Sequence, residues 1–401
     1  MNEFSCGVRT ISCQASTFPT MRWLLALVLV VAALATPAVA DARLPVLKID
    51  SRRAIPNDPK VPATLRMPGF RGRIGIETRG QSSQRFPMKS FAVELNRDAG
   101  LLGMPKDDDW VLYAPYNDKS LMRNALAYRT ADLLGRYAAR TRFVNVRLNG
   151  RYHGIYVLMQ KLELGRGRVQ GEALYEMTFQ FQAKSKSPSF DTPIRKRPIV
   201  WEDPERGDLS KREALALARP VRAAERALYG PGGWRKYIDP ASAADFALLN
   251  ELFKNEDAFH ASTYMSLHAD GRLRLGPLWD FDISMGNSTY GPSRLLRGWM
   301  LEYRDWAEKL YNDRSFIKRM GNRWRALRAD GLRGKVMRLI NGNYRQLRGP
   351  ARSHFRRWPV LNTVLWPAPT ARGSYRAEVR ALRSWVDRRM DWLDGRFMRR
   401  R

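Results

Sequence analysis

Alternation of apolar and polar residues predicts strands in the first part of the chain. A two-residue hairpin is expected at Asn149-Gly150, because this dipeptide is typical of tight β-turns. A proline-containing loop is expected after the first strand. The ranges that read as strands are 43–53, 72–77, 88–95, 143–148 and 154–159. Their period of two predicts a β-rich region here.

Apolar residues at helical spacing predict helices elsewhere. A helix is expected over 118–137, where Gly135 ends the run, and another over the apolar segment 241–249. Region 165–235 is expected to hold little regular structure beyond one helix near 209–228. The residues that share a helical face are Leu121, Ala125, Tyr128 or Arg129, and Leu133, then Phe316, Met320, Trp324 and Leu327, and finally Val379, Leu382, Val386 and Leu393.

Two carboxylates interrupt an apolar segment at Trp279-Asp280-Phe281-Asp282-Ile283. We expect this segment to be a buried strand that turns at Gly286-Asn287. A buried carboxylate is costly unless it is paired or binds a metal, so Asp280 and Asp282 are candidate ligands of a divalent ion. The alternative is a strand end with two solvated aspartates.

A second acidic segment, 250–265, follows the predicted helix 241–249 and precedes a hairpin whose turn is 269–271. In phosphoryl transfer, one Asp orients the attacking hydroxyl from a loop, and a second Asp holds the metal after a short hairpin. Asp257 and Asp280 fit these two roles. The alternative is a helix end with ordinary surface charges.

The first 40 residues read as an export signal. Met21-Arg22 opens a basic start, residues 24–35 are apolar, and Ala38-Val39-Ala40 is a cleavage signal. We expect the mature protein to begin after Ala40 and to be exported to the periplasm, the cell surface or the medium. No later segment approaches the roughly 20 apolar residues of a membrane span. An uncleaved anchor is the alternative.

The chain of 401 residues is strongly basic, with a formal net charge of +31. Residues 1–40 hold two basic residues and one acidic residue, so the remainder carries +30. Such a surface attracts polyanions, and for an exported protein we expect anionic cell-envelope polymers. Nucleic acid is not expected as a partner, because no nucleic-acid-binding motif accompanies the charge. An arginine-rich chain with merely solvated basic faces is the alternative.

Cysteine chemistry is excluded from the mature chain, and no histidine metal site is indicated. Both cysteines, Cys6 and Cys13, precede the cleavage signal, and the four histidines show no metal-ligand spacing. A hydrolase is not indicated, because no GxSxG nucleophile motif occurs.

Six segments together resemble the CotH kinase family, which is related to protein kinases. They are RGQSS (79–83), PMKSFAVEL (87–95), LLGMPKDDDWVLYAPYNDKSLMRN (101–124), LNGRYHGIYVLMQK (148–161), NELFKNEDAFHASTYM (250–265) and GPLWDFDISMGN (276–287). The resemblance implies an α+β, two-lobed protein-kinase-like fold with an antiparallel-sheet N-lobe and a helical C-lobe. On this basis we divide the chain into the pre-segment with signal peptide 1–40, N-lobe 41–164, variable insertion 165–235, catalytic core 236–300 and C-terminal helical extension 301–401.

The resemblance also implies ATP and Mg²⁺ or Mn²⁺ as cofactors, with a protein Ser or Thr hydroxyl as acceptor. Asp257 then positions the acceptor hydroxyl, and Asp280 holds the metal, with Asp282 or Asn287 near the same ion. The turn 79–83 and the following strand are expected to bind the ATP phosphates, because backbone N–H groups and a strand lysine serve this purpose in kinases. The residues expected there are Arg79, Gly80, Ser82, Ser83 and Lys89.

Three positions depart from the patterns of the family and of kinases in general. Gln160, placed with Lys161 at the hinge beside the adenine, stands where many relatives have Glu. The helix 118–137 contains no Glu to pair with Lys89. Ser262 replaces the Asn that usually binds a second metal, and a hydroxyl is a weaker ligand. A non-catalytic envelope or spore-coat-like surface protein is therefore the competing hypothesis, and the scarcity of ATP outside the cytoplasm favours it.

Overall fold

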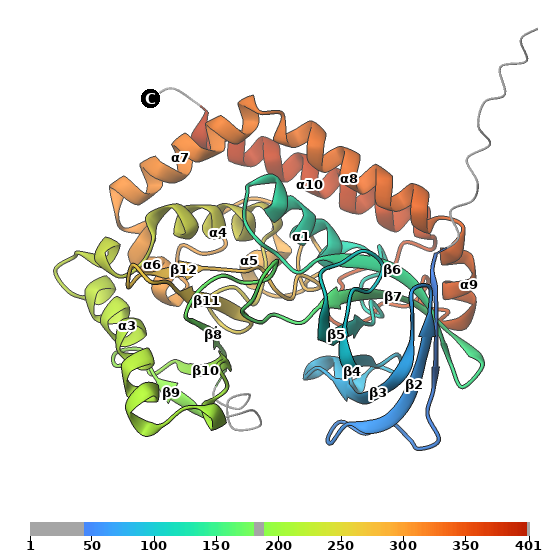
Figure 1. The fold of residues 1–401 in the computed structure, drawn as a ribbon. Coiled ribbons are helices and arrows are strands. Elements are labelled where there is room, and N and C mark those ends of the chain that lie inside the picture. The colour runs from blue at the N-terminus through green and yellow to red at the C-terminus, as the bar shows by residue number, and fades with distance from the viewer. Residues whose placement is uncertain (1–43, 180–187, 399–401) are drawn as a thin grey trace, which may run out of the picture. The chain divides into compact units, whose positions relative to one another are not determined.

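The computed structural model describes residues 44–179 and 188–398, and its N-terminal part forms a closed seven-stranded barrel (Figure 1). Strand order is β1-β2-β3-β4-β5-β7-β6, and a parallel pairing of β1 with β6 closes the barrel. The other neighbouring strands are antiparallel. Their bounds are β1 Val46–Asp50, β2 Val61–Met67, β3 Phe70–Arg79, β4 Ser90–Ala99, β5 Asp107–Tyr113, β6 Thr141–Leu148 and β7 Arg151–Gln160.

Alternating apolar side chains fill the barrel, as Ile74 and Ile76 of β3 and Val93 of β4 show. The indole of Trp358, which follows α9 (Pro350–Arg357), joins this core and donates to the His153 carbonyl at 2.8 Å. Gly154 makes the approach of α9 to β7 possible. It has φ +118°, and a Cβ there would lie 2.9 Å from the Trp358 indole nitrogen.

A second sheet has the order β12-β11-β8-β10-β9, with antiparallel neighbours throughout. The strands are β8 Ala173–Met177, β9 Ser189–Asp191, β10 Pro198–Asp203, β11 Thr263–Leu267 and β12 Leu273–Leu275. The helix expected near 209–228 is confirmed as α3 (Lys211–Tyr229). The expectation of little other regular structure in 165–235 was wrong, because this segment also supplies β8, β9 and β10. One of them, the fully buried β8, pairs with β11, which is distant in sequence.

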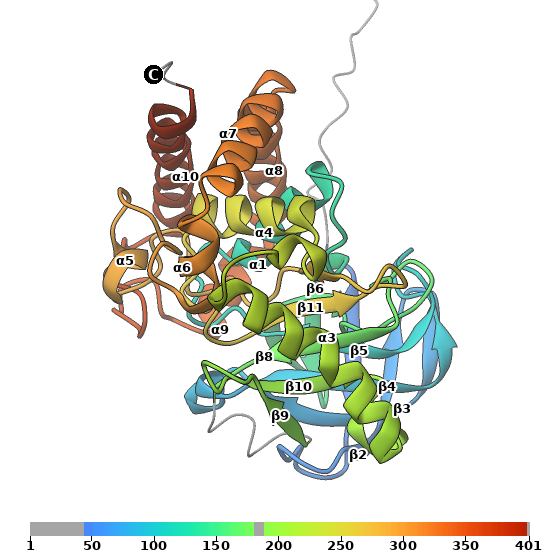
Figure 2. The same ribbon diagram turned by 90° about the vertical axis from the view of Figure 1, so that its left-hand side faces the viewer.

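Helix α4 (Pro240–Phe253) is buried between the second sheet and the C-terminal helices. Asp239 caps its start by accepting from the Ala241 and Ser242 N–H groups, and Pro240 occupies its first position. Lys254 ends it with φ +48°. Figures 1 and 2 show α8 and α10 crossing the helices α1 (Arg123–Leu133) and α4. The C-terminal helices are α5 Gly291–Arg294, α6 Asp305–Tyr311, α7 Arg314–Ala329, α8 Leu332–Leu347 and α10 Tyr375–Phe397.

The mixed α+β class predicted from the sequence is confirmed. The expected turn at Asn149-Gly150 joins β6 to β7, and the turn at 269–271 joins β11 to β12. The loop expected after the first strand was wrong in part, because it contains β2. The expected antiparallel sheet is closed into a barrel by the parallel β1–β6 pair, which periodicity cannot reveal. Within the described residues, no helix is both long and apolar enough to cross a membrane. The predicted signal peptide lies outside them.

Candidate active site

Two backbone hydrogen bonds join the two acidic segments predicted from the sequence. The Glu256 N–H, beside Asp257, donates to the Ile283 carbonyl at 3.2 Å. The Met285 N–H donates to the Phe253 carbonyl, at the end of α4, at 2.7 Å. The loop after α4 and the segment after β12 are therefore held against each other.

The segment around Asp280 is irregular, so the buried strand expected over 279–283 was wrong. Asp280 has φ +57°, which ends any strand, and its N–H donates to the Tyr128 hydroxyl at 3.1 Å. The next N–H, of Phe281, donates to the Asn124 side-chain oxygen at 2.6 Å. Side chains of α1 thus take the place that a neighbouring strand would have filled.

The carboxylate of Asp282 is held by Asn117, which lies just before α1. The Asn117 amide donates to the Asp282 carboxylate at 2.6 Å. The Asn287 amide donates to the Asp282 carbonyl at 2.8 Å and to the Asn117 carbonyl at 3.2 Å. Arg123 donates to the Ser284 carbonyl at 3.1 Å. Asn287 therefore shapes the acidic segment through its amide N–H groups.

The carboxylates of this site repel one another. Burial raises the pKa of Asp257 to about 7, the charge of Asp282 adds to the rise, and Arg304 opposes it. Burial also raises the pKa of Asp280 well above its usual range, with contributions from Asp282 and Asp257, and Arg79 opposes this rise. The pKa of Asp282 is likewise raised by burial, although the Asn117 hydrogen bond lowers it. A cation placed here would relieve the repulsion.

The carboxylates fit a nucleotide-bound Mg²⁺ better than a metal site made of protein alone. Among residues 44–179 and 188–398, no three His, Cys, Asp or Glu side chains form a group that could hold a metal ion. Mg²⁺ usually takes only one or two carboxylates and completes its shell with phosphates and water. Asp280 and Asp282 meet that requirement. Ser262 ends the Asp257 loop, and within the described residues no hydrogen bond involves its hydroxyl.

The Tyr113 hydroxyl, from the end of β5, is buried and lacks a hydrogen-bond partner among the described residues. Burial raises its pKa, and the charges of Asp282, Asp118 and Asp280 add to the rise. The hydroxyl therefore lies near the same carboxylates. An unpartnered buried hydroxyl beside acidic groups suits a site that awaits a ligand.

The barrel reaches this site through Arg79, the last residue of β3. Its guanidinium lies 5.5 Å from the centre of the Trp279 ring, next to Asp280. Gly80 follows with φ +109°, a conformation that residues with a side chain rarely adopt, and a Cβ there would meet the Ser83 hydroxyl. A short 3-10 helix, η1 (Ser82–Arg85), completes the turn between β3 and β4.

Lys89 contacts this turn rather than the carboxylates. Its ammonium donates to the Gln84 carbonyl of η1, and its own carbonyl accepts from the Tyr156 hydroxyl at 2.9 Å. Within the described residues no carboxylate pairs with it. The structure thus groups Lys89 with Gly80, Ser82 and Ser83, and it brings Arg79 to the acidic site.

Both predicted hinge residues are engaged within the protein. The buried Gln160 side-chain oxygen accepts from the Arg140 N–H at 3.1 Å, while its amide nitrogen has no partner among the described residues. Lys161 pairs with Glu163 at 2.7 Å and Asp109 at 2.9 Å. Burial lowers the pKa of Lys161, but these ion pairs outweigh burial and raise it. The hinge role of both residues stays a prediction.

Sequence analysis assigned no role to four residues that shape the site: Tyr113, Asn117, Tyr128 and Arg304. Arg304 donates to the Glu256 carboxylate at 2.6 Å and steadies the Asp257 loop. Asn117 could have been found from the sequence, because it lies in the segment 101–124 that carries part of the family resemblance. Arg304 lies outside all of those segments.

Comparison with known proteins extends the observations on the site. The family model described as CotH kinase protein matches residues 76–393. The inner spore coat protein H of Bacillus subtilis (strain 168) is 29% identical over 112 residues. That match covers 28% of this chain and 30% of the spore coat protein, so the chain spans under a third of this curated relative's length.

Proposed function

The chain belongs to the CotH kinase protein family, and we propose on that premise that it is an exported kinase that transfers the γ-phosphoryl group of ATP to a protein Ser or Thr hydroxyl. The observation that carries the proposal is the joining of two acidic segments into one buried site that Arg79 faces from the barrel. In this proposal the fold is two-lobed and kinase-like: the barrel is the N-lobe, and the second sheet with its helices is the C-lobe.

Asp257 is the proposed acceptor of the hydroxyl proton. The hydroxyl oxygen attacks the γ-phosphorus, the bond to the bridging oxygen breaks, and ADP leaves while the proton passes to the Asp257 carboxylate. A raised pKa of about 7 suits this role, because a general base works best near the ambient pH. Arg304 and Glu256 hold its loop.

Asp280 and Asp282 are the proposed ligands of Mg²⁺ or Mn²⁺, which would neutralise charge on the ATP phosphates. Asn117 orients Asp282, and Tyr128 orients the backbone of Asp280. Asn287 contributes by shaping their segment, and Ser262 stays a candidate ligand. Gly80 lets the turn approach the phosphates closely, since it carries no side chain. Arg79, Lys89 and the turn's N–H groups would bind phosphate oxygens, as Ser82 and Ser83 also would.

The test is transfer of labelled phosphate from ATP, with Mg²⁺ or Mn²⁺, to the protein itself and to an acidic, serine-rich acceptor protein. We expect labelling by the unchanged protein and a loss of about 10²- to 10⁴-fold in Asp257→Asn, because removing a general base has this effect. Asp208→Asn is the matched control, since Asp208 is exposed and lies in the short 3-10 helix η2 (Arg206–Asp208) outside the site. Equal labelling by the unchanged protein and Asp257→Asn would refute the role of Asp257.

A second candidate function is a non-catalytic surface or spore-coat-like protein. The relative's name and the net charge of +31 favour it, because a basic surface binds anionic envelope polymers. Export, with cleavage near Ala40, is part of both proposals. An unchanged protein that melts cooperatively but transfers no phosphate under any of these conditions would favour the binding function.

A further inference from the structure

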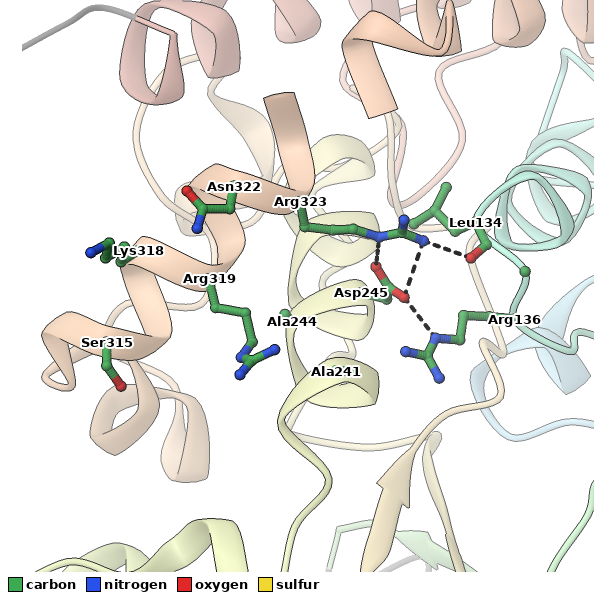
Figure 3. Close-up of a pocket in the computed structure, with 11 residues that line it drawn as sticks. Leu134, Arg136, Ala241, Ala244, Asp245, Ser315, Lys318, Arg319, Asn322 and Arg323 are labelled. Carbon is green, nitrogen blue, oxygen red and sulfur yellow. Dashed lines mark hydrogen bonds and ion pairs between the residues drawn. The ribbon is translucent and has the colours of Figure 1, made fainter. Parts of the chain in front are cut away.

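A cavity of about 740 Å³ lies between α4, α7 and the end of α1 (Figure 3), and no residue of the acidic site lines it. It is lined mostly by polar and cationic side chains. The carboxylate in its lining belongs to Asp245, near the middle of α4, whereas Asp257 lies beyond the C-terminal end of that helix. The cationic side chains that line it are Arg136, Lys318, Arg319 and Arg323.

Asp245 fixes two of these cations. It is only 3% exposed, and it accepts from the Arg136 and Arg323 guanidinium groups at 2.7 Å each (Figure 3). Arg323 also donates to the Leu134 carbonyl at 2.7 Å. One carboxylate thus holds two guanidinium groups side by side at the cavity wall. Their remaining N–H groups are pre-positioned for a planar anion, which lowers the entropy cost of binding.

The other two cations are uncompensated. Lys318 and Arg319 are exposed on α7, and neither forms an ion pair within the described residues. Four cationic side chains and one carboxylate therefore give this cavity an excess of three positive charges. Such an excess favours an anionic ligand over a neutral one.

A second cavity, of about 250 Å³, adjoins the first and shares Gly135 and Arg136 with it. Its wall is largely apolar. The apolar part of the wall includes Ala131, Phe246, Leu249, Leu275, Pro277 and Leu278, and polar side chains such as Gln170, Ser242, Ser266, His268 and Arg274 also line the cavity. A ligand that fills both cavities must combine acidic groups with an apolar group.

We propose that the two cavities form a docking groove for an acidic peptide segment of a partner protein. Its carboxylates bind Arg136, Arg323, Lys318 and Arg319, and an apolar side chain next to them enters the second cavity. Nucleic acid fits less well, because the aromatic side chains of the groove, Tyr137 and Phe246, line the second cavity, whereas the cavity that holds the cations has none on which bases could stack. The groove goes beyond the proposed phosphoryl transfer and does not depend on it.

The test measures binding of a fluorescein-labelled peptide rich in Asp and Glu that carries one Leu, by fluorescence anisotropy. We expect Lys318→Glu/Arg319→Glu to weaken binding about tenfold or more, because both groups then repel the peptide. Arg380→Glu/Arg383→Glu is the matched control. It makes the same charge change at two exposed positions of α10 outside both cavities, and we expect less than about a twofold effect.

Three results would overturn the proposal. Equal weakening by the two double variants would mean that only net charge matters. An unchanged affinity when the peptide's Leu is replaced by Ser would remove the second cavity from the groove. Tighter binding of polyphosphate or single-stranded DNA than of the peptide, with the same sensitivity to Lys318→Glu/Arg319→Glu, would assign the groove to a phosphate polymer. Thermal melts of both double variants establish that they are folded.

Discussion

Two carboxylates near the end of α4, those of Glu251 and Asp257, lie a few residues apart but have different surroundings. Glu251 is fully buried and paired with Arg389 of α10 at 2.9 Å. Its carboxylate also accepts from the Met300 and Leu301 N–H groups and from the Tyr311 hydroxyl at 2.7 Å. Burial raises the pKa of both carboxyls, but Arg389 and the hydrogen bonds lower that of Glu251. The charges of Asp282 and Glu256 instead raise the pKa of Asp257 further, to about 7.

The difference separates a carboxylate that anchors a helix from one that we propose to be catalytic. Glu251 has its acceptor positions filled, so it anchors the C-terminal helix α10 to α4. Asp282 is buried, and Asp257 and Asp280 lie half-buried near it with less compensation, which costs stability. Groups with such raised pKa values concentrate at functional sites, because a bound cation or substrate relieves the repulsion there.

The largest effect on stability is expected for Arg389→Met, which tests the structural role of Glu251. It leaves Glu251 buried without its cation, and removing one partner of a buried ion pair costs about 3–5 kcal/mol. We expect a loss of that size in the free energy of unfolding, measured by urea denaturation. Arg388→Met, at the exposed neighbouring position, is the control and should change little. A loss below about 1 kcal/mol would show that Glu251 does not anchor the helix.

A smaller effect of opposite sign is expected for Asp280→Asn. The pKa of Asp280 in the folded state lies well above its ordinary value of 3.8, so between these two pKa values the folded state binds more protons than the unfolded state. The free energy of unfolding therefore falls as pH rises through it. Asn lacks the charge and tolerates the positive φ. We expect Asp280→Asn to stabilise the metal-free protein by roughly 1–2 kcal/mol at pH 8 and by less at pH 5.

Urea denaturation at both pH values measures this effect, with Asp208→Asn as the control. Mg²⁺ with ATP should raise the stability of the unchanged protein more than that of Asp280→Asn, because the proposed ligand is missing from the variant. A variant that is less stable than the unchanged protein at pH 8 would show that the Asp280 charge is compensated.

The sequence predicted features whose cause is local. Asn149-Gly150 forms the expected turn because both residues adopt positive φ, 48° and 76°, which this dipeptide favours. The apolar face on α7 is likewise present, with Phe316, Met320 and Trp324 buried. These features depend on neighbours within a few residues, which periodicity reports directly.

Features that depend on distant contacts could not be predicted. The segment at Asp280 resembles a strand in composition, but the Asp280 N–H donates a hydrogen bond to the hydroxyl of Tyr128, 152 residues away. The Asn117–Asp282 bond joins residues 165 apart, and barrel closure pairs Val46 with Asn145. Motif spacing could nominate Asp257 and Asp280 as candidates. It could not show that Arg79 rather than Lys89 lies by the carboxylates.

The smallest predicted effect compares two hydroxyl groups that lie near the same carboxylates. Tyr128→Phe removes the acceptor of the Asp280 N–H and leaves that group unsatisfied, so we expect a loss of about 1 kcal/mol in the free energy of unfolding. Tyr113→Phe removes a buried hydroxyl that has no partner among the described residues, so its effect should be near zero or stabilising. Both variants are measured by urea denaturation without metal. Equal losses would mean that the Tyr113 hydroxyl is hydrogen-bonded in solution, and the acidic site would then resemble the satisfied surroundings of Glu251.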